Sequence, residues 1–393
     1  MNKKKTILSS AIVLYFIIGL EILIMISPFA GFFYSVFNPF LLEIAKYPAT
    51  RWLSAFFLPH MVVPPDAFLK FVRVMGSALF VGGMALFFIC ASQIYLNKFL
   101  KRGAVIGGIY SFIRHPQYLN LAIAGTGLSI LWPRFLVVVL WLAMVLIYYF
   151  LSRDEERRML RSHADDYRLY MERTGMFLPK PVETVIMPQG AGGRTALFVL
   201  LSIFAPGSAF FLRSYTISHL PIWSDNNVVA MSILDDDKFK MEHRMPDILR
   251  MDEIRTRLND NDKYLVYFLP PHYIMQGLIA DTGGDWKLYK QHHTISMITD
   301  WIFHPFSHLS EAHQGMHTVM QHEAHSVNGG MTRRLIFLKI GNAESAALSD
   351  MFSINAGRIP QFMIDIDIHD LRLFDLKELP DETGWGTVPT PVF

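Results

Sequence analysis

The residues best suited to chemistry form two short polar runs on either side of an apolar stretch. The first run, Arg114-His115-Pro116-Gln117-Tyr118, places a cation, an imidazole and a phenol directly before an apolar segment. Pro116 suits the first turn of a helix. The second run contains Glu155-Glu156 at the end of that segment. If the segment folds as a hairpin, the carboxylates return to the level of Arg114 and His115, and a two-sided pocket follows.

These residue types favour binding and positioning over nucleophilic attack. A carboxylate such as Glu155 can accept hydrogen bonds, and the planar fork of Arg114 can hold a carboxylate or phosphate. We find no Gly-x-Ser-x-Gly element in residues 1–212, so a nucleophilic hydrolase is not favoured. Each run alone is also typical of an interfacial anchor or a solvated helix end.

Taken together, the ordered motifs resemble a known superfamily. After the Arg-His-Pro-x-Tyr element come a hairpin and Glu155-Glu156, and then further residues in the same order: Leu160, Tyr167, Tyr170 and Phe177-Leu178-Pro179. Residues 70–180 thereby resemble the isoprenylcysteine carboxyl methyltransferase and phospholipid methyltransferase superfamily. Asn120 stands where many members have Gly, and His163-Ala164 stands where they commonly have Phe-Gly.

The resemblance implies an integral membrane enzyme that binds S-adenosylmethionine at the cytoplasmic face and methylates acceptors arriving from the lipid phase. It assigns the cofactor to a set of residues: His115, Pro116, Tyr118, Gly125, Gly127, Glu155, Glu156 and Tyr167. Arg114 and Glu155 become the candidate catalytic residues. Gly125 and Gly127 have an alternative role in close helix packing. A sulfonium methyl donor is already activated, so its transfer needs alignment and water exclusion more than proton chemistry.

The elements that must position these residues are membrane helices. The chain is 52% hydrophobic and 18% charged over 393 residues, and soluble domains carry about 25% charged residues. A bilayer core takes about 20 apolar residues in a helix. We expect about five spans: Ile7–Phe29, Val72–Tyr95, two helices within Pro116–Leu151 separated at Trp132-Pro133-Arg134, and a short fifth, Ala196–Leu212, interrupted by Pro206-Gly207. The first is read as a retained anchor, since its apolar run is too long for a signal peptide.

Charge orients these spans. Residues 1–212 hold 20 Lys/Arg against 10 Asp/Glu, whereas residues 213–393 hold 16 against 24. Most of the basic residues flank the spans on one side, and the opposite side receives Lys46, Arg51 and Arg134. The positive-inside rule then puts the amino terminus in the cytoplasm and the acidic half outside, as in a bacterial inner membrane protein with a periplasmic domain.

The second half reads as a mixed α+β domain. Four segments have the composition of strands: Asn227–Ile233, Lys263–Leu269, Arg334–Ile340 and Gln361–Ile368. The last alternates apolar and polar residues, as a half-buried strand does. Met245–Leu258 reads as one surface helix with Ile248, Leu249, Ile254 and Leu258 on its apolar side. The predicted domains are therefore residues 1–212 and 213–393.

Histidines are concentrated in the second half, which has 12 of the 15. His304 and His308, and His313 and His317, are two i,i+4 pairs that would suit zinc or copper. The alternative is that they only form hydrogen bonds. The sequence His322-Glu323-Ala324-His325 is one residue short of a zinc-protease motif, so no peptidase is predicted.

Two classes of function remain. The first is a membrane methyltransferase that acts on a lipid-phase or membrane-associated acceptor. The second is a methyltransferase-like scaffold that serves as an accessory subunit, its exported domain docking to partners in a larger membrane complex or binding metal. The acidic second half lacks a basic aromatic surface pattern, so nucleic acid is not expected as a partner.

Overall fold

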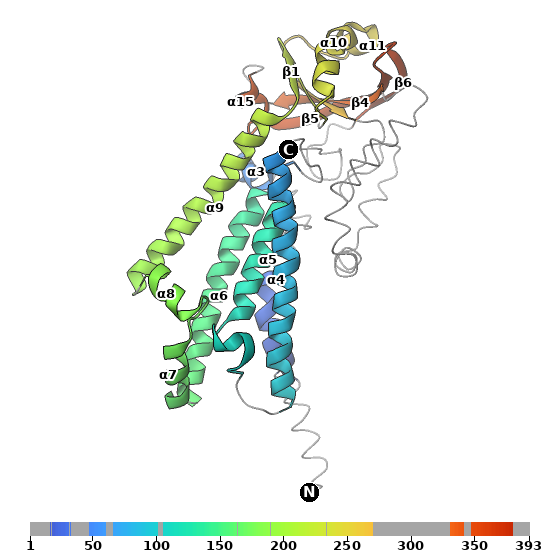
Figure 1. The fold of residues 1–393 in the computed structure, drawn as a ribbon. Coiled ribbons are helices and arrows are strands. Elements are labelled where there is room, and N and C mark those ends of the chain that lie inside the picture. Colours follow the sequence, from blue (N-terminus) through green and yellow to red (C-terminus); the bar gives the residue numbers. More distant parts are fainter. Residues whose placement is uncertain are drawn as a thin grey trace. The chain divides into compact units, whose positions relative to one another are not determined.

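A computed structural model describes residues 16, 18–30, 32, 47–59, 66–100, 105–162, 164–188, 190–232, 234–269, 331–341 and 347–379. The chain forms two compact units that interleave along the sequence. The first comprises Met1–Asn38, Leu79–Ser129 and Val137–Phe204, and the second comprises Pro39–Ala78, Ile130–Leu136 and Ala205–Phe393. The first unit is helical, and the second contains the sheet (Figure 1).

Among the described residues, three helices are long and apolar enough to cross a membrane: α4 (Ala67–Phe99), α6 (Phe135–Ser162) and α9 (Ala191–His219). Two shorter apolar helices accompany them, Ile18–Ala30 and the 16-residue α5 (Pro116–Leu131). An integral membrane protein with a mixed sheet domain is therefore supported, whereas the predicted count of about five spans is not confirmed.

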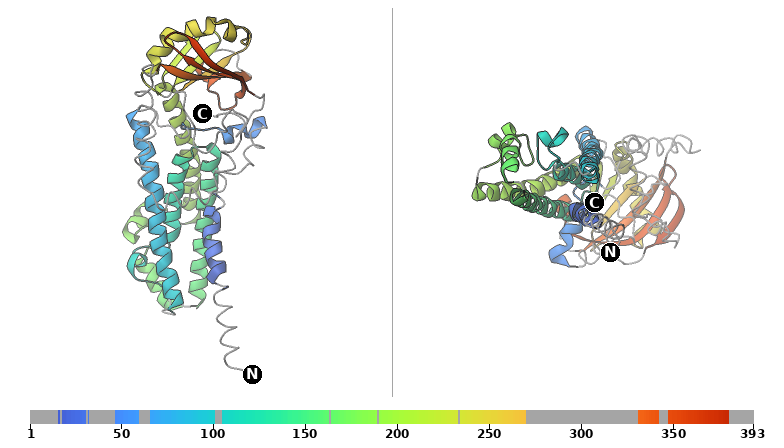
Figure 2. Two further views of the ribbon diagram at one scale, coloured as in Figure 1. Left: turned by 90° about the vertical axis from the view of Figure 1, so that its right-hand side faces the viewer. Right: turned by 90° about the horizontal axis from the view of Figure 1, so that it is seen from below.

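The predicted hairpin is present as α5 and α6, which run side by side (Figures 1 and 2). Gly125 allows the two helices to approach closely, because a Cβ there would lie 2.7 Å from Met144 Cε and 2.8 Å from Trp141 Cδ1. Trp141 Nε1 also donates to the Ala122 carbonyl at 3.0 Å. On another side of α5, a Cβ at Gly83 of α4 would lie 2.6 Å from Ala124 N. Small residues thus set the spacing of the hairpin and α4.

Helix α9 differs from its prediction. The expected interruption at Pro206-Gly207 is wrong, because α9 continues through Pro206 from Ala191 to His219. Proline removes one backbone hydrogen bond, and a membrane helix tolerates that loss when neighbouring polar groups and local adjustments satisfy the freed carbonyl. The helix is 29 residues long, so the predicted span of about 17 was an underestimate.

In the second unit, the turn between α5 and α6 is held by a preceding segment of chain. The Phe57 amide donates to the Pro133 carbonyl at 2.8 Å, and the Phe135 amide donates to the Ala55 carbonyl at 3.2 Å. The Arg134 guanidinium lies 3.9 Å from the centre of the Phe56 ring. The α3 helix (Pro48–Ser54) leads into this segment. The turn is therefore ordered by backbone pairing as well as by Pro133.

Among the described residues, the sheet has six strands in the order β1-β2-β3-β4-β5-β6: Ile222–Asp225, Val228–Ser232, Tyr264–Leu269, Thr332–Gly341, Gly357–Asp367 and Arg372–Glu378. Of these, β2 and β3 pair in parallel and the other neighbours pair antiparallel, and α10 (Asp237–Arg250) and α11 (Asp252–Arg255) lie between β2 and β3 in the chain. All four predicted strands are confirmed within a few residues at their ends. The first and last strands, β1 and β6, were not predicted.

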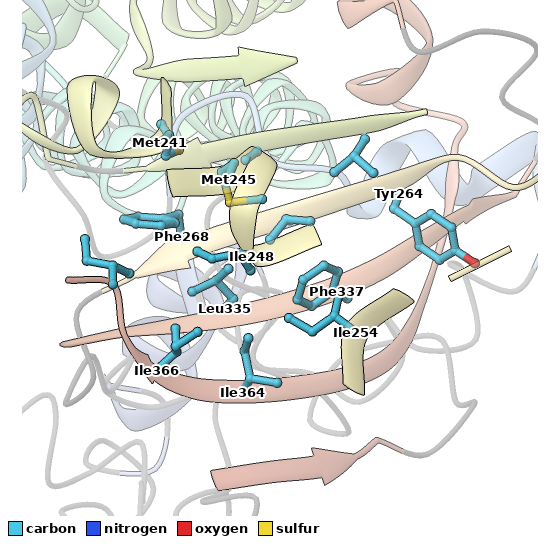
Figure 3. Packing of buried hydrophobic residues seen from close by; sticks show 14 of the residues in the cluster. Met241, Met245, Ile248, Ile254, Tyr264, Phe268, Leu335, Phe337, Ile364 and Ile366 are labelled. Atoms are coloured by element: carbon cyan, nitrogen blue, oxygen red, sulfur yellow. The ribbon is translucent and has the colours of Figure 1, made fainter. Parts of the chain in front are cut away.

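One face of the sheet packs against α10 and α11. Met241, Met245 and Ile248 of α10 and Ile254 of α11 meet Phe337, Ile364 and their neighbours in one buried cluster, as Figure 3 shows. The alternation predicted for β5 is confirmed, since Phe362, Ile364, Ile366 and Ile368 all belong to this cluster. The helix prediction was wrong in its bounds, because α10 begins at Asp237 and extended backbone at Met251 separates it from α11.

The other face is also covered, so the sheet is not half-buried as predicted. Met363 lies there in a second cluster with Met231, Leu265 and Tyr267. The end of α9 contributes Ile217, and Leu220 follows directly after that helix. The α15 helix (Leu348–Met351) with the following residue contributes Met351 and Phe352. Helices on both faces therefore account for the near-continuous apolar runs of β2 and β3.

A buried ion pair joins α10 to the sheet. The Arg333 guanidinium on β4 donates from Nη2 to Asp237 Oδ1 at 2.8 Å, and both side chains are 0% exposed. Ser232 Oγ donates to the second carboxylate oxygen of Asp237 at 2.6 Å. In contrast, Arg334 and Asp365 form a pair across β4 and β5 at 2.8 Å that is partly exposed, at 24% and 17%. Removing one partner of a buried pair costs much more than removing one of an exposed pair.

We expect Asp237→Ala to destabilise the sheet by about 3–5 kcal/mol, because it leaves the buried Arg333 charge without this carboxylate. Amide hydrogen exchange in β3 and β4 of the full-length protein should then accelerate by about a hundredfold or more. Asp365→Ala is the matched control, with an expected cost of about 1 kcal/mol or less. Equal effects of the two substitutions would contradict this account.

Candidate functional site

The site is built in the first unit where the loop before α5 meets the loop after α7 (Ala164–Arg173). The Arg114 amide donates to the Gly175 carbonyl at 2.9 Å, and the His115 amide donates to the Met176 carbonyl at 3.0 Å. Gly175 is needed for this approach, because a Cβ there would overlap the Leu178 carbonyl and the Glu183 carboxylate. Backbone pairing thus fixes both residues just before α5 begins at Pro116, as predicted.

Arg114 connects three parts of the unit. Its Nε donates to Glu156 Oε1 at 2.7 Å, with the two side chains 7% and 5% exposed. Its Nη1 donates to the Thr174 carbonyl, and it lies 3.4 Å from the Met171 carbonyl. The hairpin therefore brings α6 back to Arg114 as the sequence predicted. Because Arg114 donates to protein groups from two of its nitrogens, it orders the site.

His115 lies between the two carboxylates. Its Nδ1 is 3.3 Å from Glu155 Oε2 and its Nε2 is 3.6 Å from Glu156 Oε1, at ion-pair distance. Both ring nitrogens are buried and neither makes a hydrogen bond of good geometry. Burial lowers the pKa of His115, but the two carboxylates more than offset it, so the pKa lies above its usual value. Protonation of His115 therefore depends on both glutamates.

Glu155 is held differently from Glu156. Tyr118 donates its hydroxyl to Glu155 Oε1 at 2.5 Å, and the Tyr118 ring stacks on Tyr148 of α6 with centroids 4.9 Å apart. The Glu155 side chain is 34% exposed, against 5% for Glu156. Since Arg114 balances the charge of Glu156, Glu155 is the carboxylate that remains open to a ligand. A donor of hydrogen bonds or a cation would suit it.

Tyrosines of the α7 region close the polar cluster. Tyr167 is buried, and burial followed by the nearby charge of Glu156 raises its pKa. Tyr170 donates its hydroxyl to the Tyr110 carbonyl at 2.6 Å, and burial raises the pKa of Tyr170 to about 12. The predicted Tyr167 therefore joins the cluster. Sequence reasoning did not assign roles to the carbonyls of Thr174 and Gly175, because backbone acceptors leave no signal in residue type.

The predicted glycines lie away from this cluster. Gly125 and Gly127 are nine and eleven residues beyond Pro116 along α5, or about 14 and 17 Å at the rise of an α-helix. Gly125 packs against Trp141 and Met144, which is the alternative role considered for it. Asn120 is buried and lies 3.7 Å from the Cys90 sulfur of α4. His163 lies outside the described residues.

No metal centre accompanies the cluster in the described part of the chain, where no group of three or more His, Cys, Asp or Glu side chains could hold an ion. The predicted zinc or copper ligands His304, His308, His313 and His317 lie outside the described residues.

The raised pKa of His115 predicts a pH-dependent stability. A group whose pKa is higher in the folded state stabilises the protein fully below its unfolded value, near 6.5, and loses that contribution as the pH rises through the folded value. The difference in thermal midpoint between the wild type and His115→Asn should therefore shrink as the pH rises above about 6.5. His243→Asn, at an exposed histidine of α10, controls for histidine replacement. A difference that grows with pH would contradict the ion-pair arrangement.

Comparison with known proteins supports a methyltransferase. Residues 92–165 match the family model described as phospholipid methyltransferase, which is less than a fifth of the 393 residues. The match begins within α4 and covers α5, α6 and the first residues of α7. No curated protein and no solved structure gave a match to the chain. The resemblance predicted from the ordered motifs is thus confirmed: the match of residues 92–165 to the phospholipid methyltransferase model is consistent with the isoprenylcysteine carboxyl methyltransferase and phospholipid methyltransferase superfamily.

Proposed function

We propose that the protein is an integral membrane methyltransferase that takes a methyl group from S-adenosylmethionine and transfers it to a lipid-phase or membrane-associated acceptor at the cytoplasmic face. The observation that carries the proposal is the different exposure of the two carboxylates. Glu156 is buried against Arg114, whereas Glu155 is 34% exposed and is the carboxylate that a ligand can reach beside His115. The phospholipid methyltransferase family implies S-adenosylmethionine as the donor.

The residues present fit this cofactor. The sulfonium and ammonium groups of S-adenosylmethionine are cations, and Glu155 is an exposed carboxylate that Tyr118 holds in place. The two buried nitrogens of His115 make no hydrogen bond of good geometry, so they have capacity for a polar ligand. The proposed binding residues are His115, Pro116, Tyr118, Glu155, Glu156 and Tyr167. Gly125 and Gly127 lie farther along α5, and we propose that they line a more distant part of the same pocket.

When bound, the cofactor supplies an activated methyl group on sulfur. The protein then has to align the acceptor and exclude water. Glu155 would hold the cofactor by accepting hydrogen bonds from its amino group or its ribose, and would thereby orient the methyl donor. The stacked rings of Tyr118 and Tyr148 keep water from this side of the carboxylate. Arg114 acts on Glu156 and on the loop after α7, so we assign it a positioning role in place of the catalytic role expected from the sequence.

The surface around the site suits an acceptor from the lipid phase. Phe112, two residues before Arg114, is 66% exposed, and Ile147 and Phe150 of α6 are 43% and 60% exposed. Exposed aromatic and aliphatic side chains on a membrane helix contact lipid tails at little cost. An amphiphilic acceptor could therefore reach the cluster along α6 without leaving the bilayer.

The first functional test separates the two glutamates. We expect Glu155→Gln to weaken S-adenosylmethionine binding at least tenfold, about 1.4 kcal/mol, with little change in thermal midpoint, because its carboxylate is partly exposed. Glu156→Gln should mainly lower the thermal midpoint, because it removes the charge that balances buried Arg114. Isothermal titration calorimetry and thermal unfolding of the purified protein measure the two effects.

Asp154→Asn is the matched control, since Asp154 is 58% exposed and its pair with Arg158 lies on the surface of the same helix. It should leave both measurements unchanged. Wild-type protein that fails to bind at millimolar S-adenosylmethionine would contradict the proposal. It would favour the accessory subunit, whose exported domain docks to partners of a membrane complex.

Topology is a separate part of the proposal. The basic residues between α6 and α9 support a cytoplasmic site, and α9 would then carry residues 213–393 to the periplasmic side of a bacterial inner membrane. A reporter fused after residue 180 should report the cytoplasm, and one fused after Phe393 should report the opposite side. Cytoplasmic signals from both fusions would show that α9 does not cross.

A further inference from the structure

Among the described residues, two side chains of the sheet carry buried donors that lack the hydrogen bonds that burial normally requires. Tyr267 of β3 is 0% exposed and its hydroxyl has no hydrogen-bond partner. Arg358 of β5 is partly exposed, but its Nε and Nη2 atoms are buried and neither has a hydrogen-bond partner. Buried donors are nearly always satisfied in folded proteins, because an unsatisfied one gives up its hydrogen bonds to water without replacing them. The three unsatisfied donors on these two strands therefore call for an explanation.

The strand register places both side chains on one face of the sheet. Tyr267 is paired with Ile336 of β4, and Arg358 of β5 is paired with Ile340 of β4. Ile336 and Ile340 belong to the same buried cluster, which also contains Tyr267. Directly paired residues point to the same side of a sheet, so the side chain of Arg358 leaves β5 on the face that carries Tyr267. This face is the one opposite α10 and α11.

A second guanidinium reaches the same region from α9. Arg213 is 4% exposed and donates from Nη2 to the Phe352 carbonyl at 2.7 Å, where Phe352 belongs to that cluster. Its Nη1 donates to the Phe56 carbonyl. Burial raises the pKa of Tyr267, and the positive charges of Arg358 and Arg213 act in the opposite direction. Both guanidiniums are thus close enough to affect the phenol.

Among the described residues, the charges that act on the Tyr267 hydroxyl are those of the two arginines, and no carboxylate acts on it. The buried Nε and Nη2 atoms of Arg358 have no hydrogen-bond partner. A buried guanidinium whose donors are unsatisfied is costly unless an anion accompanies it. The region around Arg358 and Tyr267 is therefore suited to a negatively charged ligand.

We propose that Arg358, Tyr267 and Arg213 bind a phosphate group on this face of the sheet. Phosphate is favoured over carboxylate because the unsatisfied donors are three in number, Tyr267 Oη and Arg358 Nε and Nη2, and a phosphate monoester offers three strong acceptor oxygens. A guanidinium fork also matches phosphate geometry. The site is independent of the methyltransferase cluster, which lies in the first unit.

The phosphate could come from a lipid headgroup or from a free phosphate. Arg213 lies six residues before the end of α9, and α9 is one of the helices apolar enough to cross a membrane. A headgroup phosphate is available at the end of such a helix. Both sources use the same chemistry, so two probes are needed to tell them apart.

The test uses full-length protein purified in a maltoside detergent and freed of phospholipid. Inorganic phosphate is titrated by calorimetry, and retention of phosphatidic acid, whose headgroup is a phosphate monoester, is counted by native mass spectrometry. We expect the wild type to bind at least one probe. Tyr267→Phe, which removes one oxygen atom, and Arg358→Gln should each weaken that binding by about tenfold.

Tyr264→Phe is the matched control, because Tyr264 lies on the same strand with its ring in the cluster on the opposite face. Arg372→Gln removes an arginine from the exposed edge strand β6. Both should bind like the wild type. Tyr267→Phe should also keep the ligand-free thermal midpoint, since it deletes a donor that has no partner, while it loses the rise in midpoint that the bound probe produces.

Binding of inorganic phosphate alone identifies a free phosphate as the ligand. Retention of phosphatidic acid alone identifies a lipid headgroup. Either result supports the site. Wild-type protein that binds neither probe at millimolar concentration overturns it. Equal binding by the wild type and Tyr267→Phe overturns it as well. If Arg358→Gln does not fold, the comparison of Tyr267→Phe with Tyr264→Phe decides.

Discussion

The ion pair between Arg114 and Glu156 is the interaction on which the candidate site depends. It joins the loop before α5 to the end of α6 at 2.7 Å, where both side chains are nearly buried. The same guanidinium donates to carbonyls of the loop after α7. A buried pair of this kind contributes little net stability, because desolvation offsets the attraction. Its effect is to specify one arrangement of three chain segments, and His115 and Glu155 take their places within it.

In that arrangement the two adjacent glutamates have different partners and different roles. Consecutive residues of a helix point about 100° apart, so Glu156 faces Arg114 while Glu155 faces Tyr118 and solvent. The sequence alone treats Glu155-Glu156 as one acidic run. Their different burial follows from which side of α6 meets the loop before α5. The structure therefore separates a positioning carboxylate from one that is open to a ligand.

Much of this could be predicted from local signals. Pro116 at a helix start, Pro133 in a tight turn and the alternation along β5 each depend on a few neighbouring residues, and each was predicted correctly. The failures depend on distant contacts. Helix α10 begins earlier than predicted, at Asp237, because the Asp237 carboxylate pairs with Arg333, which lies 96 residues later. Met363 is buried because the end of α9 and α15 cover that face of the sheet. Strands β1 and β6 are edge strands, each paired with a single neighbour, β2 and β5 respectively, and their registers depend on that neighbour.

The length of α5 explains why the polar groups of the site must satisfy one another. Its 16 residues rise about 24 Å, which is less than the roughly 30 Å of a bilayer's hydrocarbon core. Helix α5 therefore cannot place both of its ends in the headgroup layers. Arg73 of α4 donates to the carbonyls of Ile130 and Leu131 at one end, and the Arg114 cluster is at the other. Polar groups at the level of the lipid tails require internal partners. Each end of α5 has such partners, so the helix can lie in a bilayer whichever of its two ends is the deeper one.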